Sequence, residues 1–209
     1  NEHGVRTVLP SDNFDDARPG DKPAMAAVVE DVKAGAIAEV SNKRALSAPN
    51  SLRFVDAPGL TYYFPHIYYS PNLTGTQRLQ LDFDLYREPG SMLWTEWRNT
   101  ASYAKLGPSL WIEKDDQLLL NEKKPTGVKI PAGEWIHFTI TDGIGALADG
   151  KWDMKITNQS GKVLFDGKDL ACGPEFDRLA LQVAQLEQAV ARLEAHLAAE
   201  GAEASSPPQ

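Results

Sequence analysis

The sequence predicts an all-β fold, an antiparallel β-sandwich of the jelly-roll type that is followed by one amphipathic helix. Between about residue 27 and residue 170, short apolar or alternating runs are separated by turn-forming sequences such as EPGS, PAG and ADG. No helical period of comparable length interrupts them. After GPEF the pattern changes to apolar residues three and four positions apart, which indicates a helix.

The first 26 residues are polar and rich in Asp, Gly and Pro, which is typical of an irregular entry segment. Its carboxylates could hold a calcium ion, a cation that prefers six to eight oxygen ligands. They are Asp12, Asp15, Asp16 and Asp21. No EF-hand spacing is present, and acidic loops of this kind are commonly only solvated. We therefore expect no cofactor, with calcium as the alternative.

The clearest strand covers residues 77–88, where every second residue is apolar. Side chains alternate across a pleated strand, so one set faces the core. That set is Leu79, Leu81, Phe83 and Leu85. The opposite face carries Asp82 and Asp84 and is expected to meet water.

Three further runs alternate in the same way. They are residues 92–99, 134–141 and 151–157. The side chains expected in the core are Leu93, Trp97, Ile136, Phe138, Ile140, Trp152, Met154 and Ile156. In the first run the other face carries Trp94, Glu96 and Arg98.

The run TYYFPHIYYSPN at residues 61–72 combines five aromatic rings with a histidine. Pro65 cannot donate to a β-ladder, so we expect it to end regular pairing and to leave residues 66–72 as an aromatic loop. At least half of these rings should be core residues. Tyr68 and Tyr69 are the candidates for a ligand-binding surface in that loop.

Residues 176–200 are expected to form the helix, and residues 201–209 a disordered tail. Its apolar seam is Phe176, Leu179, Val183, Leu186, Val190, Leu193 and Leu197. An isolated helix of this length is marginal in water and needs a partner for the seam. A short parallel coiled coil, which would make a homo-oligomer, is favoured over packing on the same chain's sandwich.

The order of predicted strands and turns is set by the segments SLRFVDAPG, LQLDFDLYREPGSMLWTEWRN, GPSLWIEKDDQLLLNEKK, IPAGEWIHFTI and GPEFDRL. This order resembles that of the concanavalin A-like lectin/glucanase jelly rolls, in particular the laminin-G-like domains of exported bacterial proteins. The resemblance covers roughly residues 12–179 and rests on the order of strands and turns. It implies two curved antiparallel sheets in one domain, placed at residues 1–175, with sugar-binding or catalytic residues on the concave face. Where such domains add a closing strand after GPEFDRL, this chain has the seam helix.

The composition of the chain limits the binding partners and the cellular location that we expect. The net charge of −8 makes nucleic acid an unlikely partner, because a phosphate-binding surface would oppose the overall field. No apolar run reaches the roughly 20 residues that span a bilayer. Cys172 is the only cysteine, so no internal disulfide can form. The resemblance implies a secreted, periplasmic or cell-surface protein, and the start without Met is compatible with export.

These patterns favour a non-catalytic binding module for carbohydrate, since sugars stack on aromatic rings while charged groups and amides satisfy their hydroxyls. The expected ligand-binding residues are Tyr68, Tyr69, Asp82, Asp84, Trp94, Glu96, Arg98 and Trp111. One alternative is an assembly domain that oligomerises through its C-terminal helix. A second is a glycoside-cleaving enzyme that uses Asp82, Asp84 or Glu96, since glycosidases need two carboxylates in one cleft.

Overall fold

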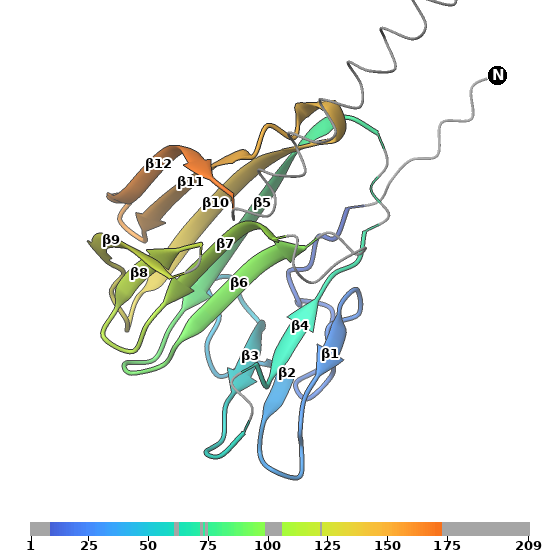
Figure 1. Cartoon of the computed structure of the whole chain (residues 1–209). Helices are drawn as coiled ribbons and strands as arrows, with labels where there is room; N and C mark the ends of the chain where they lie inside the picture. The colour runs from blue at the N-terminus through green and yellow to red at the C-terminus, as the bar shows by residue number, and fades with distance from the viewer. Residues whose placement is uncertain are drawn as a thin grey trace, which may run out of the picture. The chain divides into compact units, whose positions relative to one another are not determined.

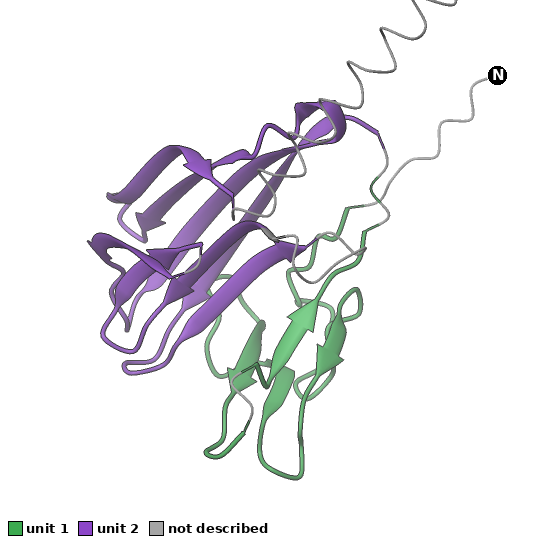
Figure 2. Ribbon diagram, viewed as in Figure 1, with its two compact units in different colours: residues 1–74 green, residues 75–209 purple. Residues whose placement is uncertain are grey.

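The computed structural model describes residues 9–60, 63–71, 73, 75–98, 106–121 and 123–172. The chain divides into two compact units, Asn1–Thr74 and Gly75–Gln209 (Figure 2). All named strands pair antiparallel, and the described residues contain no α-helix, so the predicted all-β class is confirmed. The expected helix at 176–200 and the tail at 201–209 lie outside the described residues. The domain boundary expected at residue 175 stays a prediction.

Unit 1 contains two small antiparallel pairs (Figure 1). β1 (Ala27–Val29) pairs with β4 (His66–Tyr68), and the register sets Ala27 opposite Tyr68. β2 (Ile37–Ser41) pairs with β3 (Ser51–Val55). Ala36, Ala38 and Val40 are buried and contribute to the core of this unit.

The aromatic loop predicted at residues 66–72 is wrong in its first part, because His66–Tyr68 forms strand β4. Pro65 directly precedes the strand and takes no place in its ladder, so its missing N–H interrupts nothing. The strand that pairs with β4 lies nearly 40 positions earlier in the chain. A local pattern does not reveal such a distant partner.

Unit 2 contains two four-stranded sheets (Figure 1). The first has the order β12-β11-β10-β5, and its strands are β5 (Gln77–Tyr86), β10 (Trp135–Ile144), β11 (Lys151–Asn158) and β12 (Val163–Ala171). The second is a meander of β6 (Leu93–Arg98), β7 (Leu106–Ile112), β8 (Gln117–Leu120) and β9 (Lys124–Lys129). The chain thus leaves the first sheet after β5 and returns to it at β10.

The two sheets of unit 2 share one core, which makes this unit sandwich-like. Its buried side chains come from β7 and β8 on one side and from β10 and β11 on the other. Phe83 and Phe138 stack across β5 and β10 with ring centroids 4.8 Å apart. The alternation predicted for residues 77–88, 92–99, 134–141 and 151–157 is confirmed, because every side chain expected in the core belongs to this cluster, except Leu79, which is half-buried.

Polar side chains connect the two sheets of unit 2. Arg87, which is 4% exposed, donates from Nη1 to the Ser91 carbonyl (2.7 Å) and from Nη2 to the Ile130 carbonyl (2.8 Å), and it forms an ion pair with Asp116. Elsewhere, the Asn121 side chain after β8 donates to the Ala171 carbonyl at the end of β12. These contacts join loops of the second sheet to strands of the first.

No helix in the described part of the chain is long and apolar enough to cross a bilayer.

Candidate functional site

The structure separates the expected ligand-binding residues into three groups. Asp82 and Asp84 lie on the outer face of the first sheet of unit 2, opposite its core-facing residues. The outer face of the second sheet carries Trp94, Glu96, Arg98 and Trp111. Tyr68 and Tyr69 belong to unit 1. Because a core separates the two outer faces of unit 2, the residues expected to form one surface there form two.

On the second sheet, Trp94 of β6 and Trp111 of β7 are directly opposite each other in the register. Their rings stack with centroids 4.3 Å apart and an interplanar angle of 9°. A cation accompanies each ring: the Arg98 guanidinium lies 5.8 Å from the Trp94 ring centroid, and the Lys123 ammonium lies 4.5 Å from that of Trp111. Such contacts stabilise both the ring and the charge.

Glu96 lies on the same face of β6, between Trp94 and Arg98 in sequence. Its side chain is 10% exposed, and Oε1 accepts a hydrogen bond from Arg98 Nε. Oε2 is buried and has no hydrogen-bond partner with good geometry among the described residues. Burial raises the pKa of Glu96, while the Arg98 and Trp94 side chains act in the opposite direction. With Oε1 bound to Arg98 and Oε2 buried, this carboxylate fixes the position of the guanidinium beside the rings.

The stacked indoles offer a ligand less flat surface than the sequence suggests. Each ring covers one face of the other, and because Trp94 covers one face of Trp111, the Lys123 ammonium lies over the remaining face. Lys123 also approaches Glu113 at 3.3 Å. A ligand would meet the indole edges and the charged groups beside them, rather than an open platform. Lys123 follows a turn, and nothing in the sequence pattern places it at Trp111.

Asp82 and Asp84 bind their neighbours across the sheet. Asp84 Oδ1 accepts from His137 Nδ1 at 2.9 Å, and Asp82 Oδ1 accepts from Thr139 Oγ1 at 2.7 Å. Gln80 donates to the other oxygen of Asp82 at 2.6 Å. All of these groups lie on an exposed face of the sheet, as the alternation predicted. His137 is thus a partly exposed strand residue whose ring is held by its hydrogen bond to Asp84.

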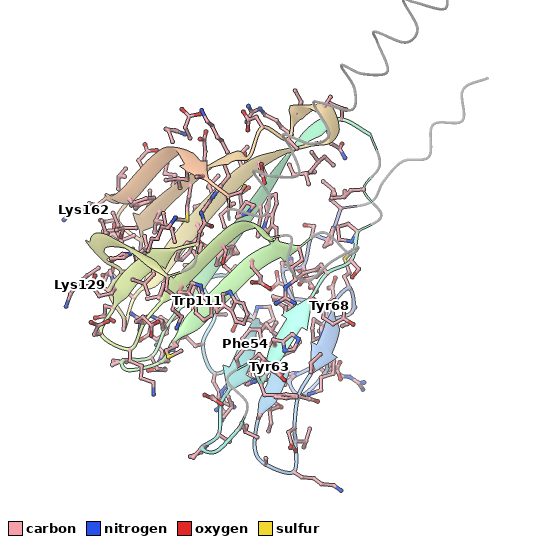
Figure 3. All side chains as sticks on the ribbon, in the orientation of Figure 1. Phe54, Tyr63, Tyr68, Trp111, Lys129 and Lys162 are labelled. Carbon is pink, nitrogen blue, oxygen red and sulfur yellow. The ribbon has the colours of Figure 1, made fainter. Side chains whose placement is uncertain are left out.

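The aromatic run of unit 1 forms an exposed row of rings, which we call the β4 row and which consists of Tyr63, His66 and Tyr68. The His66 ring lies 6.3 Å from the ring of Tyr63 and 6.3 Å from that of Tyr68. Tyr63 is 43% exposed and Tyr68 51% (Figure 3). Tyr69 alternates to the other face of the chain, where burial and the Asp12 carboxylate raise its pKa. Of the three residues of the row, the sequence pattern indicated only Tyr68 as a ligand-binding residue, and for Tyr68 and Tyr69 that role stays a prediction.

The acidic entry loop is the place where the sequence left calcium as an alternative. Asp12 accepts a hydrogen bond from the Phe14 amide, and Asp21 accepts from the Arg18 backbone and guanidinium, which lowers the pKa of Asp21. Asp12 Oδ2 and Asp15 Oδ1 are buried without a hydrogen-bond partner in the described residues. In that same part of the chain, however, no three carboxylate, histidine or cysteine side chains are arranged to hold a metal ion.

Comparison of the chain with protein-family models, with curated proteins and with solved structures finds no match to any of them. A function must therefore be inferred from the geometry of the chain itself.

Proposed function

We propose that the chain is a non-catalytic carbohydrate-binding module of a secreted, periplasmic or cell-surface protein, built on a concanavalin A-like jelly roll. Two four-stranded antiparallel sheets that share one core support the proposed architecture. The proposed site is the outer face of β6 and β7, where Glu96 and Arg98 lie beside the stacked indoles of Trp94 and Trp111.

The observation that carries this proposal is the grouping of a carboxylate, a guanidinium and two indoles on one outer face: Glu96 forms an ion pair with Arg98 beside the stacked rings of Trp94 and Trp111. The Arg98 side chain is 39% exposed and can donate to a sugar hydroxyl, while the buried Glu96 carboxylate holds its guanidinium in place. The apolar sugar carbons can pack against the indole edges. Carboxylate, guanidinium and aromatic groups together are the combination that recognises a polyhydroxylated ligand.

The enzymatic alternative has less support. A glycosidase needs two carboxylates on either side of one scissile bond. Glu96 lies on the outer face of one sheet, whereas Asp82 and Asp84 lie on that of the other. Asp82 and Asp84 do share a face, but they are neighbours on one strand, and each already accepts a hydrogen bond from β10, from Thr139 and His137 respectively. The assembly alternative depends on residues 176–200, which lie outside the described residues.

The proposal is tested by affinity gel electrophoresis, in which a polysaccharide cast into a native gel slows a protein that binds it. The probes are β-glucan, xylan, mannan and alginate. We expect at least one of them to slow the wild-type chain. Glu96→Gln should raise the dissociation constant roughly ten- to hundredfold, because a hydrogen bond to a charged group contributes about 1.5–3 kcal/mol.

The matched control is Glu39→Gln, which removes a carboxylate of a similar ion pair, with Arg53 at 3.4 Å, in unit 1. This variant should migrate like the wild type in every gel. If Glu96→Gln binds as tightly as the wild type, or if no polysaccharide slows the wild-type chain, the proposed site is wrong.

A further inference from the structure

We infer that the β4 row of Tyr63, His66 and Tyr68 is a second binding site and that its ligand is an uncharged polysaccharide. The inference rests on the proposed function only for the class of ligand, since the row lies in unit 1 and shares no residue with the Glu96 site.

The spacing of the rings suits an extended ligand. His66 and Tyr68 are two positions apart on β4, so both side chains project from one face of the strand. The rings of His66 and Tyr68 lie 6.3 Å apart and are inclined by 31°, whereas the Tyr63 ring, also 6.3 Å from His66, stands edge-on to it at 77°. Tyr63 and Tyr68 are about half exposed, and Ala27, which lies opposite Tyr68 on β1, is exposed and too small to wall off the ring. Sugar rings can therefore stack on His66 and Tyr68, with the Tyr63 ring at their border.

A hydrogen bond orients the central ring. His66 Nδ1 lies 2.6 Å from the Tyr63 carbonyl oxygen, which can only accept. Nδ1 must therefore carry the proton, and in the neutral ring Nε2 is left as an acceptor. The row thus combines aromatic surface with an imidazole acceptor and with the phenolic hydroxyl of Tyr68, which can donate or accept. Sugars present matching groups, with apolar ring faces and hydroxyls at their edges.

The two segments that form the row and its paired strand contain no charged residue, and Glu30, which follows that strand, is already paired with Lys22. No Asp, Glu, Lys or Arg occurs from residue 57 to residue 77, and the paired strand Ala27–Val29 carries none. Nothing in either segment would pair with a uronate, a sulfate or a phosphate. An uncharged ligand loses no ionic solvation when it binds such a surface, whereas an ionic ligand would lose it without compensation.

The test uses the full-length chain in native gels that contain β-glucan, xylan, mannan or the acidic polymer alginate. Tyr68→Ala should raise the dissociation constant for a neutral polymer roughly tenfold, because it removes a stacking surface. Tyr68→Phe keeps the ring and should retain most of the affinity. Binding to the row should change little between low and high salt, since it involves no ion pair.

Phe54→Ala is the matched control. Phe54 is a 49% exposed aromatic residue of β3 in the same unit, so its removal tests the loss of an exposed ring outside the row (Figure 3). This variant should bind like the wild type. An equal loss in Phe54→Ala and Tyr68→Ala would overturn the inference.

The remaining outcomes distinguish the two sites. If Tyr68→Ala binds every polymer normally while Glu96→Gln does not, the β4 row is refuted and the Glu96 site stands. The reverse result supports the row and refutes the Glu96 site, and no binding by the wild type refutes both. If sedimentation shows that Tyr68→Ala changes the mass of the particle but not its binding, the row is an interface between copies and the inference is wrong.

Discussion

Asp142 places a carboxyl group at the core-facing end of β10, two residues beyond Ile140. Its side chain is buried, and Oδ1 accepts a hydrogen bond from the Gly143 amide at 2.7 Å. Burial raises the pKa of Asp142 from 3.8 to about 6, although the Gly143 amide opposes the shift, and the Asp149 carboxylate adds to it. The alternation on β10 predicts that residue 142 faces inward, whereas its raised pKa depends on neighbours that only the fold brings near.

The buried carboxyl should make stability depend on pH. The folded state keeps the proton up to about pH 6, whereas the unfolded chain releases it near 3.8. The contribution of Asp142 is therefore fully present below pH 3.8 and is lost as the pH rises through 6. Asp142→Asn, which keeps the acceptor for Gly143, should be more stable than the wild type by about 1–3 kcal/mol at pH 8, with a smaller difference at pH 4.

Urea unfolding of both proteins at the two pH values measures this difference. Asp166→Asn, at a half-exposed position on β12, is the control and should show no comparable effect. A stability gain for Asp142→Asn that is the same at both pH values would contradict the prediction.

At the scale of the element, the end of β10 illustrates a constraint that no alternation encodes. After Gly143 the chain turns into the short 3-10 helix η1 (Gly145–Leu147). A Cβ atom on Gly143 would lie 2.0 Å from the Leu147 carbonyl oxygen, which is backbone and cannot simply move aside. Only glycine fits there.

Gly143→Ala should accordingly lower the free energy of unfolding by about 2–4 kcal/mol, through overpacking against backbone. Gly161→Ala is the control, because a Cβ at Gly161 meets nothing within 4 Å. That control should lose only about 1–2 kcal/mol, from its φ of +81°. Thermal unfolding measures the stability of both variants. If both lose the same free energy of unfolding, the contact with Leu147 has no effect.

Elements differ in how far their sequences determine them. β5, β10 and β11 alternate over eight or ten residues, and for them the core-facing side is correctly predicted, because burial on one face imposes a period of two. β4 has three residues and pairs with a strand far away in the sequence, so no period was available to identify it.

At the scale of the whole molecule, the alternation of apolar residues predicts which face of a strand is buried, but it does not predict which of the two sheets the strand joins. Asp84 and Trp94 are close in sequence, yet the chain changes sheets between them. The ligand-binding residues expected in unit 2 were therefore each placed on an outer face correctly, but on different sheets. The sheet to which each residue belongs is known only from the strand order in the structure, because that order depends on pairing between segments far apart in the chain.

The connection between the sheets can be tested at Arg87. Removing this side chain leaves the Ser91 and Ile130 carbonyls without their donor and separates Asp116 from its cation. Arg87→Ala should lower the free energy of unfolding of the chain by about 2–4 kcal/mol.

Arg53→Ala is the matched control. Its guanidinium forms a surface ion pair with Glu39, with 39% of its side chain exposed, and such pairs contribute about 0–1 kcal/mol. Urea unfolding gives the free energy of unfolding of both variants. Equal decreases in Arg87→Ala and Arg53→Ala would mean that the Arg87 contacts do not hold the sheets together.

The stacked indoles of Trp94 and Trp111 also give the chain an optical property. Two aromatic chromophores 4.3 Å apart and nearly parallel couple their electronic transitions, and the nearby cations shift those transitions further. Absorption and emission from this pair therefore depend on its immediate surroundings. A molecule that settles against the indole edges changes those surroundings, so the chain carries its own chromophoric reporter at the proposed site.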